Sequence, residues 1–326
     1  MSNKTVLVTG GAGYIGSHVV RQLGERGDNV VVLDNLSTGH RKAVLFGELI
    51  VGDTGDKELV TKILREKNID AIMHFAANTV VPESVEKPLQ YYRNNTVNVL
   101  NLLECCQQVG VKHMIFSSTA AVYGTPDTLM VTEQSPTRPE SPYGMSKLMS
   151  EHLLRDYSAT GAMSHVILRY FNVAGADPQA RIGQATPNAT HLIKVAVEAL
   201  CGKREKVSVF GTDYATPDGT GVRDYIHVED LAAAHLAALD YLRNDGKSTT
   251  LNCGYGHGFS VLEVLKTAEK VVGKPLNIHY GPRRAGDLAA IAADSTRLRE
   301  LLNWTPQYDD LEKIIAHAYA FEKGLK

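Results

Sequence analysis

The feature that most constrains the fold of this chain is a glycine-rich stretch near its N-terminus. Residues 9–16 (TGGAGYIG) follow an apolar run and precede apolar residues at helical spacing. Gly11, Gly13 and Gly16 match the pattern G-x-G-x-x-G, and Gly10, Gly13 and Gly16 match G-x-x-G-x-x-G. Glycines let the backbone approach a ligand closely, and the free N–H groups at a helix start bind anions. The stretch therefore predicts a seat for a dinucleotide pyrophosphate, with a ligand-free βα turn as the alternative.

Short, nearly continuous apolar runs alternate with helical patterns along the first half of the chain. Such runs are typical of parallel strands, because helices cover a parallel sheet on both faces. The sequence therefore predicts an α/β fold with a doubly wound parallel sheet, the Rossmann architecture. The expected strands include residues 30–33, 71–75, 114–116 and 166–168, and the expected helices include residues 57–67, 89–109 and 143–158.

The pattern changes after Asn172, where residues 174–190 are rich in glycine, proline and polar side chains. We therefore expect a dinucleotide-binding Rossmann domain in residues 1–172 and a smaller C-terminal α/β substrate domain in residues 173–326. Residues 224–255 contain a helical pattern followed by a strand pattern. This segment is expected to return to the first domain.

Composition and charge argue against several classes of function. The 326 residues are 44% hydrophobic and 21% charged, and the formal net charge is −2. This charge gives no electrostatic case for a nucleic acid or an anionic membrane as a partner. No apolar run approaches the roughly 20 residues of a membrane span, and no basic-then-apolar signal segment opens the chain.

The cysteines indicate the compartment. Cys105, Cys106, Cys201 and Cys253 lack C-x-x-C spacing. Free buried thiols are therefore expected rather than disulfides or a metal site. We expect a cytoplasmic globular protein with no bound metal.

Two aspartates at strand ends are expected to contact the cofactor. Asp34 ends the second predicted strand, 18 residues after Gly16. A carboxylate there accepts hydrogen bonds from a ribose diol and repels a 2′-phosphate, which indicates NAD rather than NADP. The alternative is an aspartate that only caps the next turn. Asp53 ends another predicted strand, where it could contact the adenine edge.

Tyr143 and Lys147 stand four residues apart in a predicted helix and therefore share one of its faces. To act as a base at neutral pH, a phenol needs its pKa lowered from about 10 to about 7, a change worth about 4 kcal/mol. A lysine ammonium on the same face, together with the positive charge of an oxidised nicotinamide, would supply that change. Tyr-x-x-x-Lys also arises by chance on surface helices, but the glycine stretch upstream favours the catalytic interpretation.

A hydroxyl-rich tripeptide, Ser117-Ser118-Thr119, follows a predicted strand. The carboxyl ends of strands face the ligand crevice in open α/β sheets. A hydroxyl there can hold the oxygen whose proton Tyr143 removes. The alternative is a hydroxyl that caps the next turn.

Taken together, these motifs resemble those of the extended short-chain dehydrogenases. The resemblance rests on the glycine stretch, the Ser-Ser-Thr tripeptide, the Tyr-x-x-x-Lys pair and the Arg-Tyr-Phe-Asn stretch at residues 169–172. Two further stretches, GTGVRDYIHV at residues 219–228 and RRAGD at residues 283–287, are similar to those of the UDP-glucose 4-epimerases. This similarity runs essentially from end to end.

The resemblance implies a reaction. Tyr143 would take the proton of the sugar 4-hydroxyl, Lys147 would lower the pKa of Tyr143 and hold the nicotinamide ribose, and Thr119 would hydrogen-bond the same sugar oxygen. Hydride would pass from C4 to NAD and return to the opposite face of a 4-keto sugar, which interconverts UDP-glucose and UDP-galactose. The resemblance also implies a homodimer, with a four-helix contact formed by residues 89–109 and 143–158.

The resemblance and the strand-end positions assign residues to the two ligands. The residues expected to bind NAD are Gly10, Gly13, Tyr14, Ile15, Gly16, Asp34, Asn35, Leu36, Ser37, Thr38, Gly39, Asp53, Thr54, Phe75, Ala76, Ala77, Thr79, Asn94, Tyr143, Lys147 and Phe171. The residues expected to bind the UDP-sugar are Thr119, Asn172, His191, Leu192, Ser208, Val209, Phe210, Arg223, Tyr225, Arg284, Asp287 and Ile291. Arginine forks match diphosphate oxygens, which suits Arg223 and Arg284. Each also has a carboxylate close in sequence, so a surface ion pair is the alternative.

Two departures from the family pattern leave properties open. Thr79 stands where the family carries a lysine near the cofactor, which leaves the strength of NAD retention open. Ile291 stands where the family carries a bulky tyrosine or a small cysteine. Its intermediate size leaves open whether N-acetylated UDP-sugars are accepted.

Three rival functions compete with this interpretation. A sugar-nucleotide dehydratase of similar sequence would carry Asp-Glu directly after the threonine, where this chain has Ala120 and Ala121. A 4-epimerase of UDP-uronic acids, UDP-pentoses or UDP-N-acetylhexosamines is the alternative within the same chemistry. A non-catalytic NAD-sensing scaffold would typically lose Tyr143 or Lys147, and both are present.

Overall fold

A seven-stranded parallel sheet forms the centre of the computed structural model, which describes residues 4–187, 189–284 and 287–325. Its strand order is β12-β7-β5-β4-β1-β2-β3, so the chain winds outward from β1 in both directions. The strands are β1 (Thr5–Thr9), β2 (Asn29–Asp34), β3 (Glu48–Val51), β4 (Ile69–His74), β5 (His113–Thr119), β7 (Ser164–Tyr170) and β12 (Thr249–Cys253). In open α/β sheets, ligands bind beyond the carboxyl ends of the strands at such a reversal.

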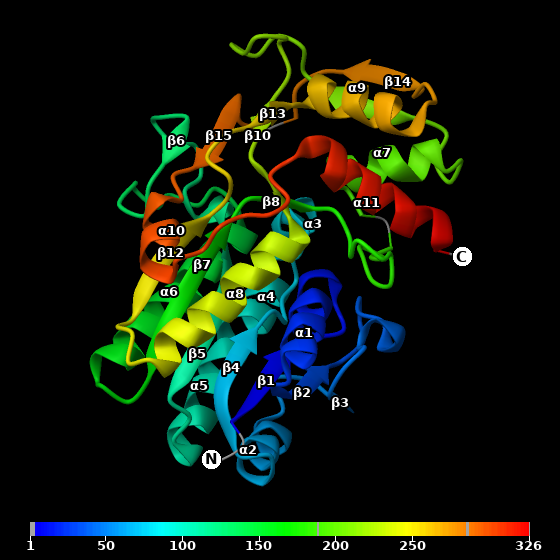
Figure 1. The fold of residues 1–326 in the computed structure, drawn as a ribbon. Helices are drawn as coiled ribbons and strands as arrows, with labels where there is room; N and C mark the ends of the chain where they lie inside the picture. The colour runs from blue at the N-terminus through cyan, green and yellow to red at the C-terminus, as the bar shows by residue number, and fades with distance from the viewer. Residues whose placement is uncertain (1–3, 188, 285–286, 326) are drawn as a thin grey trace.

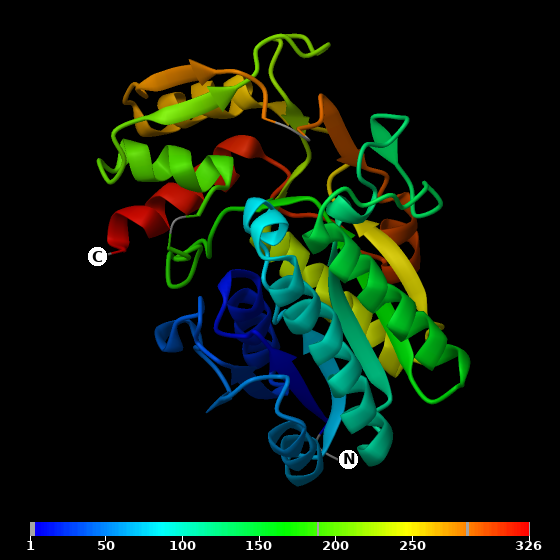
Figure 2. The same cartoon turned by 180° about the vertical axis from the view of Figure 1, so that it is seen from behind.

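Helices cover both faces of this sheet, as Figures 1 and 2 show from opposite sides. The apolar residues of α1 (Tyr14–Arg26) and α8 (Val228–Arg243) join one set of strand side chains in a buried cluster. Those of α2 (Lys57–Glu66), α5 (Asn98–Val109) and α6 (Pro142–Ala159) join the opposite set. Successive strand side chains point to opposite faces, so nearly continuous apolar strands fill both clusters. The predicted doubly wound parallel sheet is confirmed.

The helix predicted over residues 89–109 is interrupted near its start. The structure instead has α4 (Pro88–Tyr91), a π-helical segment η2 (Tyr92–Val97) and α5. The hydroxyl of Ser150 on α6 donates a hydrogen bond to the Asn95 carbonyl at 2.9 Å. A side chain of the neighbouring helix therefore satisfies a backbone carbonyl of the π-helical segment. Single π-helical turns are frequent at functional sites.

Most of the chain after β7 builds a smaller part, which lies above the sheet in Figure 1. Its elements are β8 (Asn172–Ala174), α7 (Leu192–Leu200), β9 (Val207–Phe210), β10 (Val222–Arg223), β11 (Tyr225–His227), β13 (Phe259–Ser260), α9 (Val261–Val272), β14 (Ile278–Gly281), β15 (Ala290–Ala293) and α11 (Leu311–Gly324). The helix α10 (Thr296–Leu302) instead packs against β12 and α8. The short elements within the first half are η1 (Arg41–Ala43), α3 (Val81–Glu86), η3 (Ala120–Val122) and β6 (Met130–Val131).

Three small sheets connect these elements. β9 pairs with β14, β8 pairs with β11, and the third sheet has the order β13-β10-β15-β6. Within residues 224–255, β12 joins the edge of the large sheet and α8 packs on its face. The division of the chain into domains at residue 172 remains a prediction.

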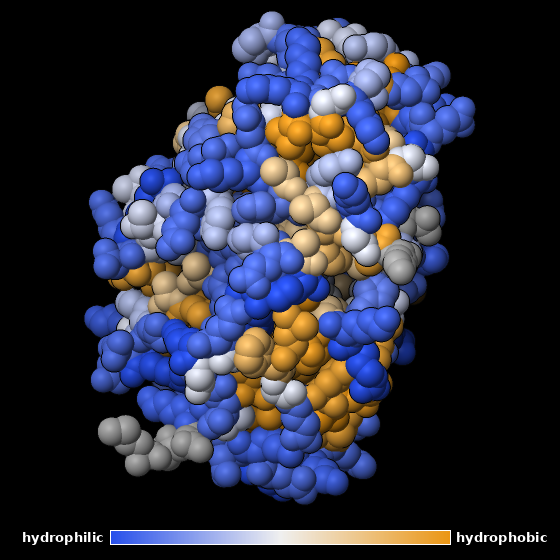
Figure 3. Space-filling model, turned by 45° about the vertical axis from the view of Figure 1, so that its right-hand side comes forward, coloured by the Kyte–Doolittle hydropathy of each residue, from blue (hydrophilic) through white to orange (hydrophobic). Residues whose placement is uncertain are grey.

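The surface is mixed in character. Figure 3 shows one face, on which a band of apolar side chains interrupts a mostly polar surface. The exposed large apolar residues include Leu45, Phe46 and Val51 around the sheet edge at β3. Such a mixture is ordinary, because more than about half of a folded surface comes from apolar atoms. In the described part of the chain, no helix has both the length and the apolar character to cross a membrane.

Candidate active site

The glycine stretch forms a tight turn between β1 and α1. Gly10 has a φ of 70°, and a Cβ on it would lie 2.6 Å from the backbone nitrogen of Ala76. A Cβ on Gly16 would lie 2.3 Å from the Gly10 carbonyl oxygen. Among the described residues, no side chain caps the start of α1 at Gly13, so its first N–H groups have no side-chain partner. This cradle fits a dinucleotide pyrophosphate. The helix opens with two more residues expected to bind NAD, Tyr14 and Ile15.

Asp34 lies beside this turn, at the carboxyl end of β2. Its carboxylate accepts hydrogen bonds from the backbone N–H groups of Ala12 at 2.9 Å and Leu36 at 2.8 Å. The Leu36 bond is the turn-capping contact considered as the alternative. Each carboxylate oxygen has a further lone pair, so the same position also fits a ribose diol. The following loop carries the other residues expected here, of which Asn35, Ser37 and Thr38 are exposed and Gly39 packs on the glycine turn.

Asp53 joins three segments. Its carboxylate accepts from Asn35 Nδ2 at 2.9 Å, from the Gly55 backbone N–H at 2.8 Å and from Asn98 Nδ2 at 3.2 Å. Thr54 beside it is buried. Asp53 therefore holds two loops against α5, and its contact with the adenine edge remains a prediction.

The loop after β4 carries the next residues expected to bind NAD. The Phe75 backbone N–H donates to Thr9, and the Phe75 ring centroid lies 4.7 Å from that of His235. The side chain of Asn95 in η2 holds this loop, because it accepts from the backbone N–H of Asn78 at 2.8 Å and donates to its carbonyl at 3.0 Å. Sequence patterns indicated Asn94 but missed Asn95. The other residues expected to bind NAD in this region are Ala76 and Ala77, both half-buried, Thr79, exposed, Asn94, half-buried, and Phe171, buried.

Tyr143, Lys147 and Thr119 converge at the carboxyl end of β5. Ser141 caps α6, which then places Tyr143 and Lys147 on its buried face with exposed fractions of 8% and 3%. Lys147 Nζ donates to the Ser117 carbonyl at 2.9 Å. Thr119 ends β5, and its side chain is hydrogen-bonded to that of Tyr143. The structure therefore brings together all three residues expected to be catalytic.

The pKa values of this trio differ from the expectation. Burial raises the pKa of Tyr143, and the hydrogen bond with Thr119 lowers it only in part. Burial also lowers the pKa of Lys147 to about 7, against an opposing contribution from Glu151. The protein's own groups therefore do not produce the lowered tyrosine pKa that the Tyr-Lys spacing predicted. Desolvation of the two side chains is the physical reason, because it disfavours their charged forms.

The lowered pKa of Lys147 predicts a pH-dependent stability. Between about 7 and the ordinary value of 10.5, the unfolded chain binds more protons than the folded chain, so the free energy of unfolding rises with pH across this window. Replacing Lys147 by methionine removes this rise. The thermal unfolding midpoint of the unsubstituted protein should therefore increase relative to that of K147M between about pH 7 and about pH 9.5. A difference that stays constant with pH would contradict this.

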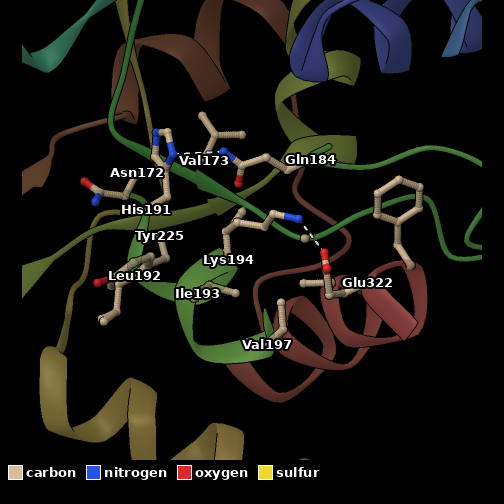
Figure 4. A pocket seen from close by; sticks show the side chains of 14 residues that line it. Asn172, Val173, Gln184, His191, Leu192, Ile193, Lys194, Val197, Tyr225 and Glu322 are labelled. Carbon is tan, nitrogen blue, oxygen red and sulfur yellow. Dashed lines mark hydrogen bonds and ion pairs between the residues drawn. The ribbon is translucent and has the colours of Figure 1, made fainter. Parts of the chain in front are cut away.

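A pocket in the C-terminal part is lined by four of the residues expected to bind the UDP-sugar, namely Asn172, His191, Leu192 and Tyr225 (Figure 4). Asn172 and Tyr225 are register partners on the parallel strands β8 and β11. His191 precedes α7, and its Nδ1 lies 2.8 Å from Gln184 Nε2. Tyr143, Lys147 and Thr119 do not line this pocket, and the assignment of its residues to the UDP-sugar remains a prediction.

The other residues expected to bind the UDP-sugar lie on β9, β10, β15 and the loop after β14. Arg223 and Ile291 are register partners on β10 and β15. The Arg284 guanidinium carbon lies 4.8 Å from the centroid of the Phe210 ring, and its Nε donates to Asp287 at 2.8 Å. Strand β9 carries the remaining two, half-buried Ser208 and buried Val209.

Only one of the two arginine ion pairs considered as alternatives is formed. Arg284 pairs with Asp287. Asp224 instead accepts three backbone N–H bonds at 3.0 to 3.1 Å, and Arg223 Nη1 donates to the Val222 carbonyl at 2.9 Å. Half-buried Arg223 thus forms no salt bridge within the described residues. A cation placed in this way suits an incoming diphosphate.

Sequence patterns missed a buried ion pair behind the catalytic residues. Arg169 Nε and Nη2 donate to the Glu151 carboxylate at 2.9 and 2.6 Å, and Ser118 Oγ donates to it at 2.6 Å. The pair joins α6, β5 and β7. Glu151 stands one helical turn after Lys147, so this spacing could have placed its carboxylate on the same buried helix face. The sequence carried no comparable pattern for Gln184, another residue at the pocket that sequence reasoning missed.

Comparisons with known proteins agree with this geometry. Residues 6–254 match the NAD dependent epimerase/dehydratase family. A protein of Azospirillum brasilense named UDP-glucose 4-epimerase is 53% identical over 322 residues, which cover 98% of this chain and 92% of that protein. The crystal structure of UDP-glucose 4-epimerase from Brucella ovis in complex with NAD superposes with a TM-score of 0.96 at 41% identity, over 98% of each chain. The UDP-Glc/GlcNAc 4-epimerase of Campylobacter jejuni gives a TM-score of 0.87 at 50% identity, over 99% of this chain and all of that one (100%).

Proposed function

The chain belongs to the NAD dependent epimerase/dehydratase family, and from that premise we propose that it interconverts UDP-glucose and UDP-galactose by 4-epimerisation. The convergence of Tyr143, Lys147 and Thr119 at the end of β5 is the observation that carries this proposal. The glycine turn and Asp34 fit NAD, and relatives with the same activity are similar over almost the whole chain.

The reaction begins with removal of the proton from the sugar 4-hydroxyl. Thr119 hydrogen-bonds that oxygen, and Tyr143 accepts its proton. Lys147, held by the Ser117 carbonyl, would hold the nicotinamide ribose. Because the protein's own groups leave the pKa of Tyr143 raised, the positive charge of the oxidised nicotinamide is needed together with Lys147 to stabilise the tyrosine anion. The glycine turn and Asp34 would hold NAD, which when bound would supply the hydride acceptor for C4 and the hydride donor to the opposite face of the 4-keto sugar. Because both catalytic side chains are buried, water is kept from the intermediate while it turns over.

Dehydration is disfavoured by the residues that follow Thr119. Elimination of water needs an acid and a base besides the tyrosine. Ala120 and Ala121 open the short helix η3, and the Ala121 backbone N–H donates to Thr119 Oγ1 at 3.2 Å. Neither residue carries an ionisable group. Retention of the full catalytic trio likewise disfavours a non-catalytic NAD-sensing scaffold.

A 4-epimerase of UDP-N-acetylhexosamines is the second candidate function. Ile291 is 5% exposed and packs in a cluster with Phe171 and Tyr123. An isoleucine side chain is smaller than a tyrosine side chain, so it leaves more room for an N-acetyl group of the sugar. The Campylobacter jejuni relative is named for both glucose and N-acetylglucosamine substrates. The same chemistry leaves UDP-uronic acids and UDP-pentoses as further alternatives.

Product analysis tests the function and separates the candidates. The purified protein is incubated separately with UDP-galactose, UDP-N-acetylgalactosamine and UDP-galacturonate, with no added reductant, and the products are resolved by chromatography. Formation of UDP-glucose supports the proposal, and turnover of another substrate alone supports an alternative. An absolute need for stoichiometric NADH would contradict epimerisation. NAD in the supernatant of boiled protein would show that the cofactor is retained despite the exposed Thr79.

We also propose a homodimer that buries the helices α3 to α6. In Figure 2 these helices lie side by side on one face. Large apolar side chains remain exposed on them, with Leu89 at 80%, and the others are Val81, Val85, Val97, Leu100 and Met149. Exposed apolar side chains gathered on neighbouring helices favour an interaction surface there.

Replacing Leu89 by glutamate is expected to shift the dimer toward monomer, because a charge would be buried at the contact. Sedimentation at micromolar concentration measures this shift. L129E is the matched control, since Leu129 is exposed on a loop that belongs to none of these helices. A monomeric unsubstituted protein, or equal effects of the two substitutions, would contradict the dimer.

A cytoplasmic location is a further proposal. All four cysteines are free thiols, and three of them are buried. Free thiols persist in a reducing compartment. Labelling of the thiols in protein taken from intact cells tests this, and disulfides would contradict it.

A further inference from the structure

Gln184, which no sequence pattern singled out, lies against His191 at the small pocket beside β8, β11 and α7. Its Nε2 is 2.8 Å from His191 Nδ1. Both side chains line the pocket together with Asn172 and Tyr225 (Figure 4). Gln184 is only 9% exposed. Its amide is therefore committed to a protein partner rather than to solvent.

This hydrogen bond fixes the position of the proton on His191. An imidazole nitrogen that accepts from an amide N–H carries no proton itself. His191 as a whole is exposed, while Gln184 covers the Nδ1 side of its ring. Partial desolvation lowers the pKa of His191, and no charged side chain among the described residues contributes to that change. The ring is therefore neutral near pH 7, and its single proton lies on Nε2. His191 thus offers an N–H donor on the side of the ring away from Gln184.

The loop that carries Gln184 is anchored at its start. The Tyr14 hydroxyl, in the first residue of α1, donates to the Gly175 carbonyl at 2.7 Å. Within the loop, Arg181 Nε donates to Asp177 at 2.7 Å. Gln184 is therefore held in place by contacts within the protein, and the orientation of His191 needs no ligand to set it.

We propose that Gln184 is a positioning residue that sets the tautomer of His191, so that His191 Nε2 donates a hydrogen bond to an acceptor oxygen of the nucleotide sugar. This rests on the proposed function, because it requires a UDP-sugar bound beside His191. Gln184 acts through His191 and lies outside the trio around Tyr143. It therefore affects substrate binding, measured as KM, and leaves kcat nearly unchanged.

The first test is a double-mutant cycle. Gln184→Leu removes the amide, and losing one correctly oriented hydrogen bond should raise KM for UDP-galactose about five- to tenfold while kcat changes less than about twofold. Made in the background of His191→Asn, the same substitution should cause no further rise, because there is no imidazole left to orient. Gln108→Leu, at an exposed position on α5, is the control. An unchanged KM in Q184L, or an equal rise in both backgrounds, would overturn the proposal.

A second substitution tests Gln184 through the pH dependence of KM, which a purely structural role would leave unchanged. In Gln184→Glu the carboxylate accepts a proton from Nδ1 and favours the imidazolium. KM should then fall more steeply as the pH is lowered from about 8 to about 6 in Q184E than in the unsubstituted protein, and stay flat in Q184E/H191N. Parallel profiles for all three proteins would overturn the assignment.

Calorimetric titration with UDP separates this proposal from the proposed reaction. Weaker UDP binding by Q184L than by the unsubstituted protein supports the role of Gln184 even where turnover fails. Normal turnover with equal UDP affinity in the two proteins overturns Gln184 alone. Absence of both turnover and UDP binding in the unsubstituted protein overturns both.

Discussion

Replacing Tyr143 by phenylalanine is expected to lower kcat for the interconversion of UDP-galactose and UDP-glucose by about 10² to 10⁴-fold, the range of general base catalysis. The substitution removes only the phenolic oxygen that accepts the proton. The ring stays packed against Tyr91, whose centroid lies 6.5 Å away. Cofactor content and the affinity for UDP should therefore stay within about twofold of the unsubstituted protein. Steady-state kinetics and calorimetric titration with UDP measure the two effects.

A second tyrosine on the same helix provides the control. Tyr157 lies near the end of α6, where its ring packs against the apolar cluster of α2 and α5. Tyr157→Phe removes the same atom from the same helix at a position remote from Thr119, and its kcat should be unchanged. Near-normal turnover by Y143F would show that another group is the base.

Replacing Glu151 by glutamine is expected to lower the free energy of unfolding by about 3 to 5 kcal/mol, because it leaves the Arg169 guanidinium buried without a counter-charge. Glu151 is 0% exposed and Arg169 is 2% exposed. The carboxylate also holds Ser118, one residue before Thr119, at 2.6 Å. The substitution should therefore reduce kcat as well as stability. Chemical denaturation followed by circular dichroism measures the free energy.

The loss of stability at acidic pH tests the Glu151–Arg169 ion pair independently. Burial raises the pKa of Glu151, but hydrogen bonding and charge from Arg169 outweigh this and lower the pKa overall. A carboxyl with a lowered pKa stabilises the fold above its unfolded pKa, and this contribution is lost as the pH falls. E151Q should therefore lose less stability on acidification than the unsubstituted protein. Glu312→Gln, which breaks an exposed pair with Lys270, is the control and should leave the unfolding midpoint unchanged. Equal stability of E151Q and E312Q would contradict the account.

The sequence predicted the parts of this fold that local patterns control. Apolar runs marked the central strands because a parallel sheet is buried on both faces. Gly10, Gly13 and Gly16 marked a turn where a Cβ would meet backbone. The four-residue spacing of Tyr143 and Lys147 placed them on one helix face, and the strand end placed Thr119 beside them.

Features that depend on distant partners could not be predicted in this way. The π-helical turn of η2 involves a hydroxyl of α6 more than fifty residues later, which bonds the Asn95 carbonyl. The low pKa of Lys147 follows from how deeply α6 is packed, which no spacing reveals. Gln184 lies in a loop without periodicity, so nothing in its sequence neighbourhood pointed to His191.

The central claim is that the hydrogen removed from C4 returns to C4 in the same site. Deuterium placed at C4 of UDP-galactose tests this directly, because NMR of the product reads the isotope at that carbon. We predict UDP-glucose that retains the deuterium at C4. Replacement of the label by hydrogen from solvent would contradict the account.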